Sequence, residues 1–119
     1  MIPTFLAVAA LAFSHGGGPS ETRGSCGGGV RSTLELKAEH GAIEVRFAAR
    51  GARRGSAWRI TLSHEGRVDW RGTAHAQGGS GAFRVRRDVR DYEGADRVSV
   101  RASGPGGVTC QAAATLPGD

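Results

Sequence analysis

Seven short segments of this 119-residue chain alternate apolar and polar residues. A period of two places every second side chain on one face of an extended strand, so each segment predicts a β-strand with one buried face. Turns rich in Gly and Pro separate the segments, and no helical periodicity competes with the alternation. The pattern predicts an all-β fold, a seven-stranded antiparallel β-sandwich formed by residues 30–116.

The apolar positions of the seven segments form the predicted core, and Trp58 and Trp70 point inward by the same alternation. The predicted core residues are Leu34, Leu36, Ile43, Val45, Phe47, Trp58, Ile60, Leu62, Val68, Trp70, Phe83, Val85, Val98, Val100 and Val108.

The order of the segments suits a fibronectin-III-like sandwich. On that plan the third, fourth, sixth and seventh segments share one sheet, and the first, second and fifth share the other. Cys26 precedes the first strand and Cys110 lies in the last, and these terminal strands are neighbours at one edge. An immunoglobulin pattern would instead place the cysteines on the second and sixth strands.

The N-terminal region predicts secretion. Residues 2–13 are apolar and uncharged, which is too short for a membrane span but suits a signal peptide with cleavage near Ala10-Leu11-Ala12. We therefore expect a signal peptide at 1–12, a flexible Gly-rich spacer at 13–29 and a tail at 117–119. No Lys or Arg precedes the apolar run, so a buried terminal strand or helix is the alternative. In an oxidising compartment Cys26 and Cys110 predict one disulfide, with two free buried thiols as the alternative.

Several motifs occur in order along the chain. They are R-G-S-C (23–26), L-E-L-K-A (34–38), G-A-I-E-V-R-F (41–47), W-R-I-T-L (58–62), S-G-A-F-R-V (80–85), G-A-D-R-V (94–98) and G-G-V-T-C (106–110). The set resembles a group of small secreted actinobacterial proteins with Ig-like or fibronectin-III-like folds and no characterised function. The resemblance covers about residues 21–116 and implies secretion, one disulfide and a sandwich fold. Its motifs are core and turn positions, so it implies no functional residue.

The net charge of +5 arises from fifteen Arg and one Lys against eleven acids. Alternation places five arginines on the outer face of one sheet, where only Asp69 offsets them; they are Arg59, Arg67, Arg71, Arg97 and Arg101. The other sheet mixes signs that can pair across strands, at Glu35, Lys37, Glu39, Glu44, Arg46, Arg84, Arg86 and Asp88. The five arginines form a candidate basic face for an anionic polymer, and a solvated face without a ligand is the alternative.

No residue pattern predicts catalysis, a cofactor or a metal. His64 and His75 with Asp69 lack any recognised ligand spacing, and we expect these histidines at the surface. Ser80 with His75 and Asp69 lacks a nucleophile elbow, and the Gly-rich loop at 78–81 precedes no helix that could cradle phosphate.

These observations predict a secreted, monomeric, non-catalytic module that binds a polyanion of the cell envelope or a protein partner. We expect no membrane span. Sequence-specific nucleic-acid recognition is not expected, because the basic face has no aromatic residue to stack on bases. The alternative is a small secreted enzyme or protease inhibitor that acts through the exposed loop Ala76–Gly81.

Overall fold

The computed structural model describes residues 20–118 and shows an all-β protein of two antiparallel sheets. The predicted signal peptide lies outside the described residues. The strands are β1 (Ser20–Arg23), β2 (Ser25–Cys26), β3 (Arg31–Glu39), β4 (Ala42–Arg50), β5 (Ala57–His64), β6 (Arg67–His75), β7 (Phe83–Arg90), β8 (Asp96–Ser103) and β9 (Thr109–Leu116). A short 3-10 turn, η2 (Pro105–Gly107), joins the last two.

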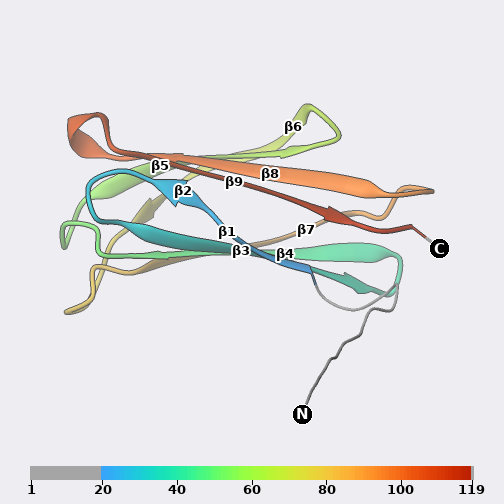
Figure 1. The fold of residues 1–119 in the computed structure, drawn as a ribbon, viewed down its shortest axis with the longest axis horizontal. Coiled ribbons are helices and arrows are strands. Elements are labelled where there is room, and N and C mark those ends of the chain that lie inside the picture. Colours follow the sequence, from blue (N-terminus) through green and yellow to red (C-terminus); the bar gives the residue numbers. More distant parts are fainter. Residues whose placement is uncertain (1–19, 119) are drawn as a thin grey trace, which may run out of the picture.

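The two sheets lie as layers over a shared core (Figure 1). The four-stranded sheet has the order β1-β3-β4-β7, and the five-stranded sheet has the order β2-β9-β8-β5-β6. The predicted grouping of the seven segments into two sheets is therefore confirmed. No helix in the described part of the chain is long and apolar enough to cross a membrane.

Residues 20–118 contain nine strands rather than the predicted seven. The additional strands β1 and β2 fall within the segment that we predicted to be a flexible spacer. The chain passes from one sheet to the other between them, because β1 pairs with β3 while β2 pairs with β9. Gly24 fits this crossing, since a Cβ there would come within 2.1 Å of the Ser32 hydroxyl. This polar segment has no apolar alternation of its own, and the edges of the two sheets supply its hydrogen bonds.

The predicted disulfide between Cys26 and Cys110 is confirmed. Cys26 lies directly opposite Cys110 in the pairing of β2 with β9, so the bond joins the second strand to the last one. Cys110 is fully buried, and the hydroxyl of Ser32 donates a hydrogen bond to Sγ of Cys26 at 3.1 Å.

Of the fifteen predicted core residues, twelve are buried, Trp70 and Val108 are partly buried against the core, and Val68 is exposed. Trp58 is 2% exposed and stacks on Phe83 of the opposite sheet, with ring centroids 5.2 Å apart. Its indole N–H donates to Ser56 Oγ at 3.0 Å, so burial leaves this polar atom satisfied. Trp70 is partly buried at the edge, where the guanidinium of Arg87 lies 4.9 Å from its ring centroid.

The loops that connect the strands lie at the two ends of the sandwich. Residues 40–41, 65–66 and 91–95 join strands at the first end, which we call the acidic end. His40-Gly41 and Glu65-Gly66 have positive φ at both residues, as expected of tight two-residue hairpin turns. Residues 27–30, 51–56, 76–82 and 104–108 join strands at the second end, which we call the arginine end.

Candidate anion-binding site

Three of the predicted arginines, Arg59, Arg71 and Arg101, lie close together on the outer face of the five-stranded sheet, and we call them the arginine triangle. Arg71 of β6 and Arg101 of β8 both lie opposite Thr61 of β5. Arg59 lies two residues before Thr61 on the same face, and all three arginines are exposed. Within residues 20–118 no ion pair joins any of them to an acid. Arg97, also exposed, lies on this face nearer the acidic end.

Arg67, the fifth predicted arginine, does not share this face. The register shifts between Leu62 and Ser63, so that Ser63 lies opposite Val68 and His64 opposite Arg67. One extra residue in β6 reverses the alternation beyond it, as a β-bulge does. Val68 consequently turns outward and is 48% exposed. The predicted positions of Arg67 on the face and of Val68 in the core are thus both wrong, for one reason.

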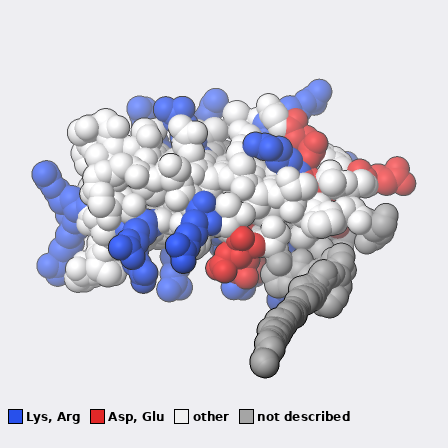
Figure 2. Space-filling model, viewed as in Figure 1, with Lys and Arg blue, Asp and Glu red and all other residues white. Residues whose placement is uncertain are grey.

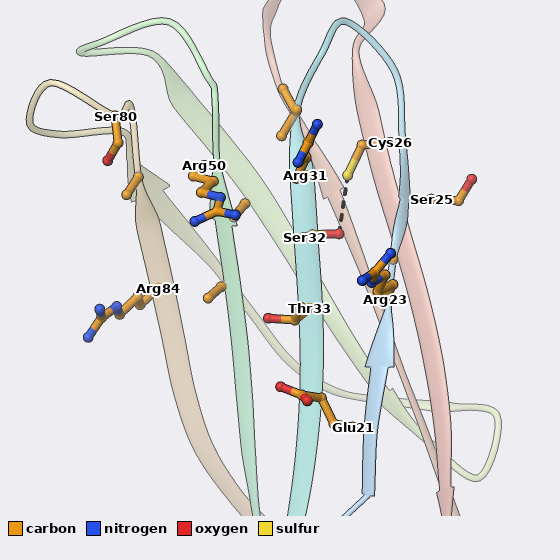
Figure 3. A pocket seen from close by; sticks show the side chains of 15 residues that line it. Glu21, Arg23, Ser25, Cys26, Arg31, Ser32, Thr33, Arg50, Ser80 and Arg84 are labelled. Atoms are coloured by element: carbon orange, nitrogen blue, oxygen red, sulfur yellow. Dashed lines mark hydrogen bonds between the residues drawn. The ribbon is translucent and has the colours of Figure 1, made fainter. Parts of the chain in front are cut away.

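A groove of about 1150 Å³ lies on the outer face of the other sheet, at its arginine end (Figure 3). Four arginines line it, and we call it the arginine groove: Arg23, Arg31, Arg50 and Arg84. Thr33 and Ala48 lie opposite each other in the middle of one row, with Arg23 and Arg84 at the ends of that row. The short side chains of Thr33 and Ala48 lie between the long side chains of the two arginines, and this difference in length forms the groove.

The charges in the arginine groove are uncompensated. Arg31 lies directly opposite Arg50, and like charges in this position repel each other. No ion pair within residues 20–118 involves any of the four arginines, and Glu21 is the sole acid among the lining residues. Guanidinium groups bind phosphate and carboxylate with two parallel hydrogen bonds, so an anion in the groove would relieve the repulsion.

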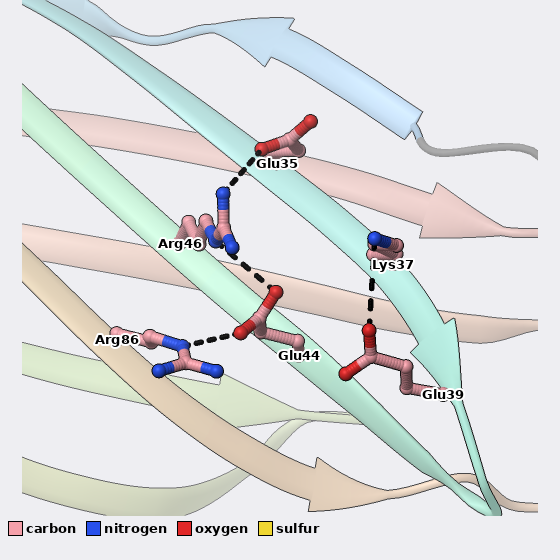
Figure 4. Close-up of polar contacts among 6 residues, drawn as sticks. All are labelled: Glu35, Lys37, Glu39, Glu44, Arg46 and Arg86. Carbon is pink, nitrogen blue, oxygen red and sulfur yellow. Dashed lines mark hydrogen bonds and ion pairs between the residues drawn. The ribbon is translucent and has the colours of Figure 1, made fainter.

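Toward the acidic end the same sheet carries ion pairs, both across strands and within them (Figure 4). Glu44 is 2% exposed and binds two guanidinium groups, with Arg46 Nε at 3.1 Å and Arg86 Nε as its second partner. Arg46 also reaches Glu35 at 3.9 Å, and Lys37 pairs with Glu39. The mixed character predicted for this sheet therefore holds for its middle and acidic end. Arg84, predicted to be part of the mixture, belongs instead to the arginine groove.

The carboxyl group of Glu44 has a pKa below its ordinary value of 4.5. Burial raises the pKa, but the hydrogen bond from Arg86 and the charges of Arg46 and Arg86 lower it by more. A carboxyl group whose pKa falls on folding stabilises the folded state above its unfolded pKa.

We expect this contribution of Glu44 to be present above about pH 4.5 and to be lost as the pH falls through the lower folded-state pKa. Changing Arg86→Gln should raise the pKa of Glu44, because one hydrogen bond and one positive charge are removed. NMR titration of the Glu44 carboxyl carbon in both proteins measures this. An unchanged titration in the variant would contradict the pairing.

Negative charge is concentrated toward one end of the sandwich. The acidic end and the strand halves that lead to it hold Glu39, Glu44, Glu65, Asp69, Asp88, Asp91, Glu93 and Asp96, together with Lys37, Arg67, Arg87, Arg90 and Arg97. The arginine end and its strand halves hold Arg23, Arg31, Arg50, Arg53, Arg54, Arg59, Arg84 and Arg101. In the view of Figure 2 the acidic side chains gather toward one end, while the other end shows only basic ones. An anionic partner is therefore attracted to the arginine end.

The structure does not bring together the histidine, aspartate and serine residues that the sequence offered for a metal site or a catalytic triad. His64 and His75 lie at opposite ends of the β5–β6 hairpin, so they cannot share a metal with Asp69. Asp69 and His75 are six residues apart in one strand, roughly 20 Å, which excludes them from a triad with Ser80.

The loop at 76–82 is held to residues 51–52 by backbone hydrogen bonds. Gly51 N–H donates to the carbonyl of Ser80 at 2.7 Å, and Ala52 N–H donates to Gly81 at 3.1 Å. β7 follows this loop, and Ser80 lines the arginine groove.

His64 is buried, although we expected a surface histidine. It is 4% exposed, and its Nε2 lies 2.8 Å from Oδ1 of the buried Asp96. The inward positions 58, 60 and 62 continue to 64, and this signal could have placed His64 inside. Asp96 comes from β8, so no sequence pattern joins the two residues.

Comparison with known proteins gives no relative. No family model, no curated protein and no solved structure matches this chain.

Proposed function

We propose that this protein is a secreted, non-catalytic module of Ig-like or fibronectin-III-like type that binds an anionic polymer of the cell envelope. The arginine groove carries this proposal, because it gathers four exposed arginines that have no acidic partner among the described residues. The disulfide supports secretion, since such bonds persist in oxidising compartments.

The spacing of the groove suits a polymer with repeated anionic groups. Arg31 and Arg50 form one row, and the row with Arg23 and Arg84 lies two residues further along the strands, about 7 Å away. Phosphate or carboxylate groups at successive units of a chain would meet successive rows. No aromatic residue of the described part of the chain lines the groove, so base stacking contributes nothing there and we expect binding that is independent of sequence.

Charged edge strands support a monomer. The edge strand β7 carries Arg84, Arg86, Arg87, Asp88 and Arg90, and such a charged edge opposes pairing with a second sheet.

Changing Arg31, Arg50 and Arg84 together to Gln should abolish binding to teichoic-acid-containing cell walls at low salt. Each arginine that contacts an anion releases counterions, so the slope of log affinity against log salt should fall by roughly 2 to 3. Co-sedimentation with purified walls between about 25 and 200 mM salt measures both the binding at low salt and the slope of log affinity against log salt. The fold should persist, because exposed positions cost about 0.5 kcal/mol or less each.

Two variants of equal charge serve as controls. Arg67, Arg90 and Arg97, changed together to Gln near the acidic end, should leave most of the binding intact. Arg59, Arg71 and Arg101, changed together on the opposite sheet, test the arginine triangle as a second surface. Equal losses from all three variants would mean a response to net charge, and the proposed site would be rejected.

A second candidate function is protease inhibition through the loop at 76–82. The backbone bonds that hold Ser80 and Gly81 to residues 51–52 favour it, because a rigid loop loses little entropy on binding. A stable stoichiometric complex with a secreted serine protease, lost on changing Ser80→Pro, would favour this function over polymer binding.

A further inference from the structure

The acidic end contains a buried histidine with an incomplete set of partners. His64 Nε2 lies 2.8 Å from Asp96 Oδ1, and the side chains of the two residues are 2% and 1% exposed. A carboxylate only accepts hydrogen bonds, so a neutral imidazole donates its Nε2–H to Asp96 and keeps a lone pair on Nδ1. Nδ1 is buried and has no hydrogen-bond partner in the described part of the chain. Because no partner at Nδ1 fixes the tautomer, the ring hydrogen can move to Nδ1 and leave a lone pair on Nε2 beside Asp96.

Two carboxylates surround this ring. One ring nitrogen of His64, one oxygen of Glu65 and one oxygen of Asp96 all lie within 4.8 Å of one another. Within residues 20–118 both hydrogen bonds accepted by Asp96, from His64 and from Tyr92 N–H, end on Oδ1. Glu65 accepts the N–H of Arg97 with Oε2, which leaves Oε1 for another partner.

The cluster is held in place and has a route to solvent. Tyr92 stacks on His64 with ring centroids 4.7 Å apart and planes 11° apart, so the imidazole cannot turn freely. A hollow of about 390 Å³ is bordered by His64, Glu65 and Tyr92 and opens beside the cluster. Asp69 at its rim adds negative charge, while Arg67 opposes a cation there.

We propose that His64, Glu65 and Asp96 form a binding site for a divalent transition-metal ion such as Zn²⁺. In the bound state the ring hydrogen lies on Nδ1, so that Nε2, the nitrogen beside Asp96, supplies a lone pair and the two carboxylates supply oxygens. Transition-metal ions accept this mixed ligand set, which purely oxygen-seeking Mg²⁺ and Ca²⁺ do not favour. The ion crosslinks the β5–β6 turn, through His64 and Glu65, to the start of β8 at Asp96. This site lies at the opposite end from the arginine groove and does not depend on the function proposed for it.

Isothermal titration of the oxidised full chain with Zn²⁺ tests the site. We expect one ion per chain, and a melting temperature that rises with the Zn²⁺ concentration because the ion binds only the folded state. The exposed Glu65→Gln should weaken binding at least tenfold while preserving the fold. His64→Gln and Asp96→Asn should remove binding, and the result for Glu65→Gln decides the question if either of these buried variants fails to fold.

Matched changes elsewhere separate this site from unspecific metal binding. Glu93→Gln and His75→Gln remove an exposed acid and an exposed histidine outside the cluster, and both should leave affinity and stoichiometry unchanged. Absence of saturable binding in the original protein would overturn the proposal. It would also be overturned if Glu65→Gln had no effect, or if either control lost as much affinity.

Discussion

Changing Cys26 and Cys110 together to alanine is expected to lower the free energy of unfolding by about 4 kcal/mol. The disulfide closes a loop with a sequence separation of 84, and its loss restores the conformational freedom of that loop in the unfolded chain. The folded state is also affected locally. β2 pairs with β9 through only two residues, so the covalent bond is its principal attachment.

Urea denaturation of both proteins, monitored by tryptophan fluorescence, measures this difference. Ser25→Ala, which alters the neighbouring residue of β2 without touching the bond, serves as the control and should change stability by less than about 0.5 kcal/mol. Treatment of the original protein with a reductant should reproduce the effect of the double variant. A loss below about 1 kcal/mol would show that the closed loop contributes little to stability.

Trp58→Ala is expected to cost about 3 to 5 kcal/mol, the range for removing a large aromatic side chain from a core. Trp58 is 2% exposed and packs against Phe83, so its loss leaves a cavity between the two sheets. Ser56 Oγ also loses the hydrogen bond that it accepts from the indole N–H. For a domain of this size the melting temperature should fall by well over 10 °C, which differential scanning calorimetry measures.

Trp58→Phe separates the contribution of aromatic packing from that of the hydrogen bond to Ser56. It keeps most of the aromatic volume and removes the indole N–H, so we expect a smaller loss than in the alanine variant. Tyr92→Ala is the control for an exposed aromatic residue, since Tyr92 is 47% exposed and outside the core. Equal destabilisation by Trp58→Phe and Trp58→Ala would mean that the hydrogen bond, rather than the packing, gives Trp58 its importance.

The alternation of residues determined most of this fold. Residues such as Leu34, Ile60 and Val98 lie at every second position, and a strand can bury only one of its two faces. The same alternation placed Arg59, Arg71 and Arg101 outside, and it could have placed His64 inside. The disulfide followed from two cysteines near the chain ends of the domain. These features are local, or they follow from the order of strands in a sandwich.

The tertiary structure decided the features that depend on neighbours distant in sequence. One bulged residue reversed the alternation in β6, which turned Val68 outward and moved Arg67 off the predicted face. β1 and β2 formed because sheet edges offered hydrogen bonds to a polar segment. Register alone placed Arg31 opposite Arg50.

The candidate sites also depend on contacts between residues that are distant in sequence. The arginine groove combines side chains from β1, β3, β4 and β7, and the metal cluster combines the β5–β6 turn with β8. In β3, β4 and β7 the groove arginines occupy ordinary polar positions of the alternation, which look the same in the sequence whether or not a neighbour compensates their charge. His64 and Asp96 occupy buried positions in two strands, and the sequence does not show that these positions meet. Pairing across strands determines which charges are neutralised, as at Glu44, and which remain unpaired, as in the groove. The sequence therefore determined the strands and the core, while the contacts between strands determined where binding can occur.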